Sequence, residues 1–330
     1  MALDSLDVVG IGNAIVDVIA HASDDFLNQQ QVAKGAMTLI DADRADELYG
    51  LMEPAVESSG GSAANTIAGI ASFGGKAGFI GKVRNDQLGN VFAHDIRALK
   101  VVYTTPPATE GAPTARCLIL VTPDAQRTMN TYLGACQALG PDDVDPMLIE
   151  TAKVTYLEGY LWDPPMAKEA FRKACQIAHA ANRKIALTLS DAFCVDRYRD
   201  EFRELIRNQV DILFANEAEI TSLYEAKDFD EALQMVRKDC DFAALTRSEK
   251  GSVVISGDEI HVIDAEKGVK VVDTTGAGDM YAAGFLYGLT HGRSLHDCGR
   301  LGSIAAAEAI SHVGARPQTP YVELMKRKLG

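Results

Sequence analysis

Short apolar runs recur along the chain, and most are followed by a stretch with helical periodicity. A continuous apolar run is expected of a parallel strand that is covered on both faces. We interpret six such runs as strands: residues 7–12, 78–81, 154–157, 185–189, 212–215 and 243–246. The intervening helical patterns cover residues 62–73, 86–99, 165–181, 199–208 and 230–238. This alternation predicts an α/β fold with a doubly wound, mostly parallel central sheet and helices on both faces.

The last third of the chain has a different pattern. Residues 251–256 and 259–264 flank Gly257-Asp258 and predict a β-hairpin. Two long alanine-rich helices are predicted after it, over residues 277–291 and 295–312.

Two regions, residues 14–40 and 101–133, do not fit the alternation. They contain β-rich segments at 36–40, 115–121 and 128–133, with no helix predicted between consecutive segments. We expect a single domain over residues 1–330, with these pieces inserted as a small separate sheet. A sheet of this kind would act as a lid that excludes water during group transfer. The alternative is an antiparallel extension of the main sheet.

Composition and charge narrow the class of protein. The chain has 330 residues and a formal net charge of −14, which argues against a nucleic-acid partner because such partners require a basic surface. No apolar run approaches the roughly 20 residues of a membrane helix, and the first ten residues do not resemble a signal peptide. Six cysteines without a C-x-x-C pair predict buried thiols in a reducing compartment. We therefore expect a cytoplasmic protein that binds neither nucleic acid nor membrane.

The segment Asp273-Thr-Thr-Gly-Ala-Gly-Asp279 carries the strongest chemical signal. The small residues Gly276, Ala277 and Gly278 let the backbone approach a ligand closely. They also precede a helix, whose N-terminus favours anions through its unpaired N–H groups and its dipole. Asp279 is thus a candidate general base beside a phosphate. A simple helix cap is the alternative, but a cap would not require Gly-Ala-Gly between two acids.

A second glycine-containing segment, Gly60-Gly61-Ser62-Ala63-Ala64-Asn65, opens the predicted helix 62–73. Gly60 and Gly61 permit close backbone contact with a ligand, and Asn65 can hydrogen-bond a hydroxyl. The alternative interpretation is a loop followed by an ordinary helix cap.

Residues 10–17 resemble a dinucleotide-binding fingerprint but fail it, because Ile15 stands where G-x-G-x-x-G requires its third glycine. This disfavours an NAD-dependent oxidoreductase. The segment still places Asn13 and Asp17 near the carboxyl edge of the sheet, where ligands bind in open α/β folds. A carboxylate such as Asp17 can accept the protons of two sugar hydroxyls.

Asn216 and Glu219 directly follow the predicted strand 212–215, and oxygen ligands of this kind suit hydrated Mg²⁺. Acids in a first helical turn are also ordinary caps. A classical phosphate loop is absent, because Gly81-Lys82 lacks the earlier glycine and the following Ser or Thr. Any ATP must therefore be held in another way.

Taken in their order along the chain, the segments described above resemble the ribokinase-like family of carbohydrate and nucleoside kinases, the phosphofructokinase-B type. The resemblance runs from residue 7 to about residue 320 and includes both family signatures, at residues 60–89 and 272–285. It implies that Asp279 is the catalytic base and that Gly276, Ala277 and Gly278 form an anion hole. It implies that Asn216 and Glu219 organise Mg²⁺ through water.

The same resemblance implies further sites. ATP would contact Asn216, Thr246, Ser248 and Gly251, with Ser248 standing where the family usually has glycine. Asp273 and Thr275, with main chain near 309–314, match a loop that binds a monovalent cation such as K⁺ in many members.

Within the family, the chain is most similar to the adenosine kinase branch. That likeness implies a reaction of ATP with adenosine that yields ADP and AMP. The residues that it implies for the acceptor are Asn13, Asp17, Gly60, Gly61 and Asn65 for the ribose, Arg127 for phosphate, and lid residues with residues 158–162 for the purine. A sugar kinase for ribose, fructose or 2-keto-3-deoxygluconate is the alternative of the same class. A non-catalytic binding or regulatory protein is the alternative of another class, and the expected assembly is a monomer or a homodimer.

Overall fold

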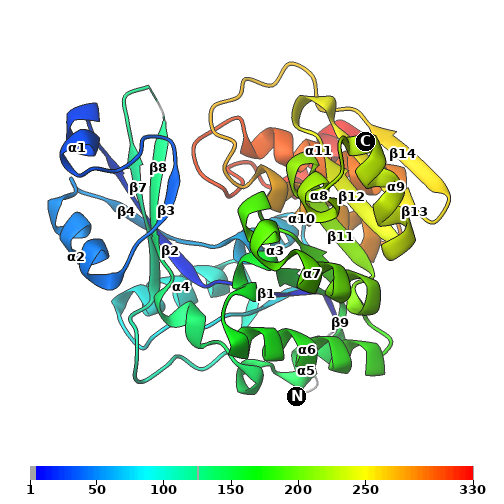
Figure 1. Cartoon of the computed structure of the whole chain (residues 1–330), viewed down its shortest axis with the longest axis horizontal. Coiled ribbons are helices and arrows are strands. Elements are labelled where there is room, and N and C mark those ends of the chain that lie inside the picture. The colour runs from blue at the N-terminus through cyan, green and yellow to red at the C-terminus, as the bar shows by residue number, and fades with distance from the viewer. Residues whose placement is uncertain (1–4, 125, 330) are drawn as a thin grey trace.

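The computed structural model describes residues 5–124 and 126–329, and it contains a large and a small β-sheet (Figure 1). Residues 1–4, 125 and 330, which the predicted domain of residues 1–330 includes, lie outside the described residues. Within the described ranges, none of the helices combines the length and the hydropathy that a membrane crossing requires. All six cysteines are buried and unpaired, which confirms the prediction of buried thiols.

The large sheet contains all six predicted strands and the predicted hairpin. Its strands are β1 (Leu6–Ile11), β5 (Ala77–Ile80), β6 (Val102–Tyr103), β9 (Ala152–Glu158), β10 (Lys184–Thr188), β11 (Ile212–Asn216), β12 (Phe242–Thr246), β13 (Ser252–Ser256) and β14 (Glu259–Ile263). Their order is β14-β13-β12-β11-β10-β9-β1-β5-β6. The strands from β12 to β6 are parallel to one another, and β13 is antiparallel to both of its neighbours, β12 and β14.

Helices cover both faces of this sheet, as predicted. One face packs against α5 (Pro146–Thr151), α6 (Pro165–Ala180), α7 (Ala192–Gln209), α8 (Glu217–Tyr224) and α9 (Phe229–Asp239). The other packs against α3 (Ser62–Ser72), α4 (Gln87–Ala98), α10 (Ala277–Thr290) and α11 (Leu295–Ala309). Neighbouring residues of β1 point to opposite faces, so Val9 lies in the first core and Val8 in the second. The apolar runs therefore reflect strands that are buried on both sides.

Several helices outside the small sheet differ from the prediction. Helix α7 begins at Ala192 rather than at residue 199, and it has a non-helical backbone at Tyr198. Helices α8 and α5 were not predicted, because each is too short to show clear periodicity. Helix α12 (Tyr321–Leu329) was also not predicted, and its Tyr321 packs with Phe73 and Met280.

The small sheet is separate from the large one, so the β-rich segments do not extend the main sheet. It is formed by β2 (Ile15–His21), β3 (Met37–Leu39), β4 (Val56–Gly60), β7 (Ala115–Val121) and β8 (Arg127–Tyr132). The strand order is β3-β8-β7-β2-β4. The sheet thus draws on residues 15–60 and 115–132, and its first piece is longer than the expected 14–40. The strand β4 escaped prediction because its sequence, VESSG, has one apolar residue.

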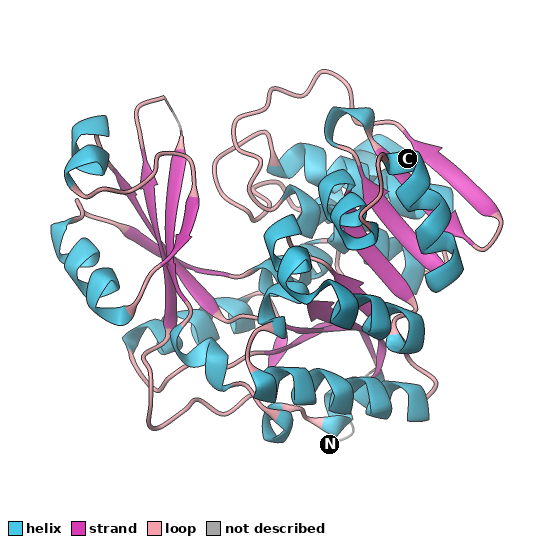
Figure 2. Cartoon of the chain, viewed as in Figure 1, coloured by secondary structure: helices cyan, strands magenta, loops and turns pink. Residues whose placement is uncertain are grey.

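The expectation of no helix between the β-rich segments was wrong. Helix α1 (Asp24–Gln29) lies between β2 and β3, and α2 (Ala42–Leu51) lies between β3 and β4. Side-chain caps start both helices: Ser23 accepts a hydrogen bond from the Phe26 N–H, and Asp41 accepts one from the Arg44 N–H. Figure 2 shows these helices on the side of the small sheet that faces away from the large sheet.

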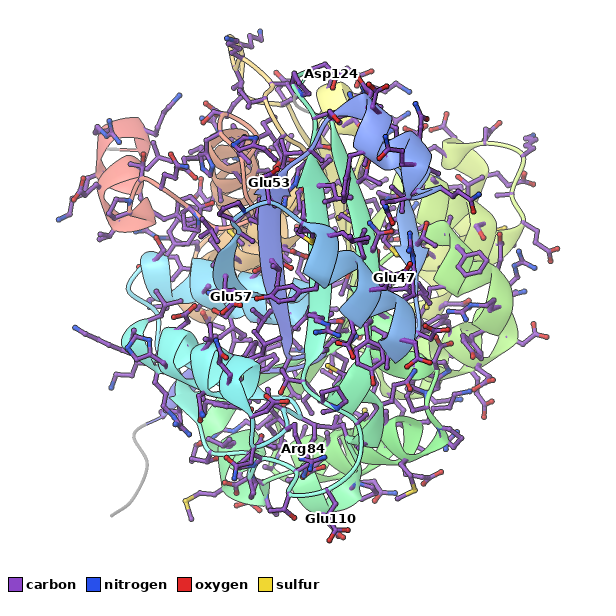
Figure 3. All side chains as sticks on the ribbon, turned by 90° about the vertical axis from the view of Figure 1, so that its left-hand side faces the viewer. Glu47, Glu53, Glu57, Arg84, Glu110 and Asp124 are labelled. Carbon is purple, nitrogen blue, oxygen red and sulfur yellow. The ribbon has the colours of Figure 1, made fainter. Side chains whose placement is uncertain are left out.

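The outer side of the small sheet carries acidic side chains, several of which Figure 3 labels. Glu47 of α2 and Glu53 are exposed there, and Glu57 lies on the edge strand β4. A charged residue on an edge strand disfavours pairing with a further strand.

Candidate active site

The predicted catalytic and acceptor residues lie where the two sheets join. Strand β1 of the large sheet ends at Ile11, and residues 12–14 lead directly into β2 of the small sheet. The first turns of α3 and α10 also meet here: Ser62 Oγ of α3 donates to Asp279 Oδ1 of α10 at 2.6 Å. The carboxyl ends of parallel strands and the N-termini of two helices therefore converge here, as at ligand sites of other open α/β sheets.

Asp279 lies in the first turn of α10 and is held from several sides. Besides Ser62, Asn65 donates from Nδ2 to Asp279 Oδ2 at 3.2 Å, and Thr66 Oγ1 donates to the Asp279 main-chain oxygen at 3.2 Å. Burial raises the pKa of Asp279 to about 6, although the hydrogen bonds from Ser62 and Asn65 oppose this shift. A fixed carboxylate with this pKa can accept a proton near neutral pH.

The segment before Asp279 has the shape that its small residues predict. Gly276 is the N-cap of α10 with φ of +76°, and no side chain caps the helix. A Cβ at Gly276 would lie 2.6 Å from the Cβ of Ala315, so only glycine fits there. A Cβ at Gly278 would meet open space, and this residue is exposed. The start of α10 therefore presents main-chain N–H groups that an anion can reach.

Asp17 on β2 lies beside Gly60, the last residue of β4, and Asn13 lies beside Gly61, the N-cap of α3. A Cβ at Gly60 would lie 2.6 Å from Asp17 Oδ2, and one at Gly61, whose φ is +97°, would lie 2.2 Å from the Asn13 carbonyl oxygen. Burial raises the pKa of Asp17 to about 6, while the charges of Arg127 and Arg316 lower it. The structure thus brings Asn13, Asp17, Gly60 and Gly61 together.

Glu158 is a buried carboxylate at this site that was not singled out from the sequence. It accepts hydrogen bonds from Asn13 Nδ2 at 2.6 Å and from the Ala63 N–H at 2.8 Å. It also explains Gly12, where a Cβ would lie 2.3 Å from Glu158 Oε2. Burial raises the pKa of Glu158 to about 7, against the hydrogen bonds from Ala63 and Asn13. Glu158 therefore fixes both Asn13 and the start of α3.

Arg127 of β8 forms a buried ion pair with Asp273, so it joins the small sheet to the loop before α10. Both oxygens of Asp273 are occupied, since the other contacts come from the Thr275 N–H, the Thr275 hydroxyl and the Gly314 N–H. Burial opposes ionisation, but the bonds from Gly314 and Thr275 hold the pKa of Asp273 below its usual value. The described residues contain no cluster of three or more His, Cys, Asp or Glu that fits a metal ion. That search does not cover a site made of Asp273, Thr275 and main-chain carbonyls, so the expected K⁺ site stays a prediction.

The predicted nucleotide residues lie elsewhere, at the ends of β11 and β12. Asn216, Thr246 and Ser248 line one surface pocket, whereas Gly251 is buried beside it and does not line it. Asn216 and Glu219 form a reciprocal cap, with the Glu219 N–H donating to Asn216 Oδ1 at 2.9 Å and Asn216 Nδ2 donating to Glu219 Oε1 at 2.5 Å. Burial raises the pKa of Glu219 to about 7. Asn216 lines the pocket, whereas Glu219 is buried and both of its carboxylate oxygens accept hydrogen bonds from Asn216, so the Mg²⁺ role implied for the pair stays a prediction.

The backbone at Ser248 has a conformation that favours glycine. Its φ is +51°, in the left-handed region that costs roughly 1–2 kcal/mol for residues with a Cβ. The turn is closed by a hydrogen bond from the Gly251 N–H to the Ser248 carbonyl oxygen at 3.1 Å.

A model of the pfkB family of carbohydrate kinases matches residues 29–321 of the chain. The chain belongs to the pfkB family. The match covers both α10 with Asp279 and the start of α3 with Gly60, Gly61 and Asn65.

Several pfkB-type and adenosine kinases are similar to the chain over nearly all of its length. An adenosine kinase from Sinorhizobium meliloti is 56% identical with a TM-score of 0.91, over 98% of this chain and 99% of that chain. A probable sugar kinase from Rhizobium etli CFN 42 is 54% identical with a TM-score of 0.92, again over 98% and 99%. The adenosine kinase of Saccharomyces cerevisiae is 26% identical over 93% of this chain and 95% of its own length. The protein is thus a sugar or nucleoside kinase with the ribokinase-like α/β fold, a family whose members use ATP.

The pfkB resemblance also suggested that residues 158–162 flank a purine, and the structure limits which of them can do so. Leu161 and Trp162 are buried, and the Trp162 ring packs against Phe171 and Phe202 in the core. Only Tyr160 of the three apolar residues is partly exposed.

Proposed function

We propose that this pfkB-family kinase is an adenosine kinase, which transfers the γ-phosphoryl group of ATP to the 5′-hydroxyl of adenosine. The observation that carries the proposal is Asp279, whose carboxylate is held by Ser62 and Asn65 at an uncapped helix start behind Gly276, Ala277 and Gly278. The adenosine kinases among the similar proteins support the nucleoside as acceptor.

In the proposed reaction, Asp279 accepts the proton of the acceptor hydroxyl as its oxygen attacks the γ-phosphorus. The new O–P bond forms while the bond between the γ-phosphorus and the β,γ-bridging oxygen breaks, so ADP leaves with the bridging oxygen. The main-chain N–H groups at residues 276–278 stabilise negative charge on the transferring group. Removing one such donor typically costs about 10²–10³ in rate at other enzyme sites.

The other predicted residues take supporting roles. Asp17 would accept both ribose hydroxyl protons, with Asn13 and Asn65 as neighbours and with Gly60 and Gly61 allowing close approach. ATP would occupy the pocket lined by Asn216, Thr246 and Ser248. Asn216 and Glu219 would hold Mg²⁺ through water, and the ion supplies charge neutralisation at the phosphates when bound.

We further propose that the small sheet is a lid over the acceptor. Asp17 lies on β2 of the small sheet, and Arg127 on β8 pairs with Asp273 in the loop before α10, so movement of the small sheet would carry part of the acceptor site with it. Closure would keep water from accepting the phosphoryl group.

A coupled ADP-release assay over adenosine, ribose, fructose and 2-keto-3-deoxygluconate tests the substrate. We expect kcat/KM to be highest for adenosine. A higher kcat/KM for one of the sugars would replace adenosine as the acceptor and keep the kinase. No ATP consumption with any acceptor would favour a non-catalytic binding protein.

A further inference from the structure

The segment between α11 and α12, residues 310–320, packs against the loop that leads to Asp279. The Gly314 N–H donates to Asp273 Oδ2 at 2.9 Å, and Ala315 packs against Gly276. Further along, the Thr319 N–H donates to Glu308 Oε1 at 2.8 Å. The segment is therefore held beside the start of α10 at Gly314 and Ala315, and against α11 at Thr319.

Arg316 projects from this segment toward the acceptor residues. Its Nε donates to Asn65 Oδ1 at 3.2 Å, and its Nη1 donates to Ser59 Oγ of β4 at 2.5 Å. Its Nη2 is buried and has no hydrogen-bond partner within the described ranges. Arg316 thus contacts α3 of the main domain and a strand of the small sheet at once.

The contact with Asn65 has a directional consequence. A guanidinium group only donates hydrogen bonds, so it must face the oxygen of the Asn65 amide. The amide nitrogen then points the other way, and Asn65 Nδ2 donates to Asp279 Oδ2. Without Arg316 the amide could turn over and present its oxygen to the carboxylate, which would be repulsive.

Arg316 is also a nearby positive charge for the acidic groups of the site. The acidic groups that interact with its charge are Asp17 on β2, Asp95 on α4 and Asp279 on α10. Asp279 in turn interacts with Asp17, Arg316, Glu158, Tyr156 and Tyr160. Arg316 is the one cation among the charges that act on Asp279 in this set.

We propose that Arg316 is a positioning residue for the base: it fixes the Asn65 amide so that Asn65 donates to Asp279, and its nearby positive charge favours the ionised form of that carboxylate. This inference rests on the proposed role of Asp279 in phosphoryl transfer. It adds a function for residues 314–316, which the sequence patterns left unassigned apart from the main chain near Gly314.

The test compares Arg316→Gln with Arg316→Lys and with Arg293→Gln, a control on the exposed turn between α10 and α11 that removes the same charge. We expect Arg316→Gln to lower kcat by about 10- to 100-fold, because small misplacements of a catalytic group have effects of this size. The acid limb of its kcat profile, measured at saturating acceptor, should move to higher pH, since loss of a cation disfavours the ionised carboxylate of Asp279. The KM for ATP should stay at the Arg293→Gln value.

Arg316→Lys keeps the charge but cannot donate to Asn65 and Ser59 with the same geometry. We expect its acid limb to stay at the parent pH while kcat recovers only in part. In a double-mutant cycle, Arg316→Gln should add little to Asn65→Ala, because both changes break the same contact. If Arg316→Gln does not fold, the test uses Arg316→Lys, both alone and in the double-mutant cycle with Asn65→Ala.

Two outcomes separate this inference from the proposed function. If Asp279→Asn keeps parent turnover, the proposed base is wrong and Arg316 loses its role with it. If Asp279→Asn is inactive while Arg316→Gln matches Arg293→Gln in kcat and in its acid limb, the base stands and the role of Arg316 is overturned. A fall in melting temperature with unchanged kcat and unchanged acid limb would likewise show a purely structural residue.

Discussion

The acceptor side and the nucleotide side of the proposed site are built in different ways. On the acceptor side, polar groups bond between distant elements: Ser62 and Asp279 are 217 positions apart, and Asn13 and Glu158 are 145 apart. On the nucleotide side, Asn216 and Glu219 are three positions apart and bond to each other. The acceptor side is therefore fixed by tertiary structure, whereas the nucleotide side is a local helix cap beside an open pocket.

This difference predicts which step each change will affect. Carboxylates held by cross-element bonds are already oriented before a ligand arrives, as efficient catalysis requires. Changes on the acceptor side should therefore reduce turnover or acceptor binding strongly. Changes on the nucleotide side should weaken ATP binding modestly and leave the acceptor constants alone.

The largest effect is expected from Asp279→Asn. Loss of the base should lower kcat by about 10²–10⁴, the usual contribution of general base catalysis. The amide has nearly the same shape, so the variant should fold and still bind both substrates in equilibrium titrations. Turnover within about tenfold of the parent would rule out a base role for Asp279.

Asp17→Asn should have the next largest effect. We expect the acceptor KM to rise about 10- to 100-fold, because hydrogen bonds to a charged group contribute roughly 1.5–3 kcal/mol. The KM for ATP should not change. An unaltered acceptor KM would mean that Asp17 does not hold the acceptor hydroxyls.

Stability supplies a control for Asp17→Asn. The pKa of Asp17 is raised in the folded protein from 3.8 to about 6, so its contribution to stability is present below pH 4 and lost as the pH rises through 6. The variant should therefore unfold no more easily than the parent at pH 8. A clear loss of stability at pH 8 would show that the change in KM reflects a damaged fold.

On the nucleotide side, Glu219→Gln should have a smaller effect. The amide removes one charge from the proposed Mg²⁺ site and weakens the cap with Asn216. We expect the KM for ATP with Mg²⁺ to rise by about fivefold, equivalent to roughly 1 kcal/mol. The acceptor KM should remain at the parent value, and an equal rise in both constants would remove the distinction between the two sides.

The smallest effect is expected from Ser248→Gly. Glycine relieves the cost of a positive φ but also gains freedom in the unfolded chain, and the two effects nearly cancel. We expect a free energy of unfolding within about 0.5 kcal/mol of the parent. Ser256→Gly, at an ordinary strand position of β13, should lose about 0.5–1 kcal/mol. Equal losses in urea unfolding of both variants would argue against strain at Ser248.

The two sides also differ in how far the sequence predicts them. Strands such as β9 and β10 are predictable because they are apolar throughout, and the motif at Asp279 is predictable because its residues are contiguous. Glu158 and Arg316 escaped prediction because their partners, Asn13 and Asn65, are distant in the chain and no local spacing marks them. The ion pair between Arg127 and Asp273 was likewise not predicted from the sequence. Arg127 was expected to contact phosphate and Asp273 to bind K⁺, whereas the structure bonds them to each other.

The most direct test of the account is the pH dependence of kcat, measured at saturating adenosine, for the parent, Asp17→Asn and Asp279→Asn. Asp279 must be ionised to accept a proton, and its pKa is about 6 in the folded protein, so the parent rate should fall as the pH drops through 6. Asp17→Asn should keep an acid limb, shifted slightly to lower pH because the Asp17 charge raises the pKa of Asp279, while the residual rate of Asp279→Asn should be flat across the same range. A parent rate that is flat through pH 6, or an acid limb that persists in Asp279→Asn, would contradict the assignment of Asp279 as the base.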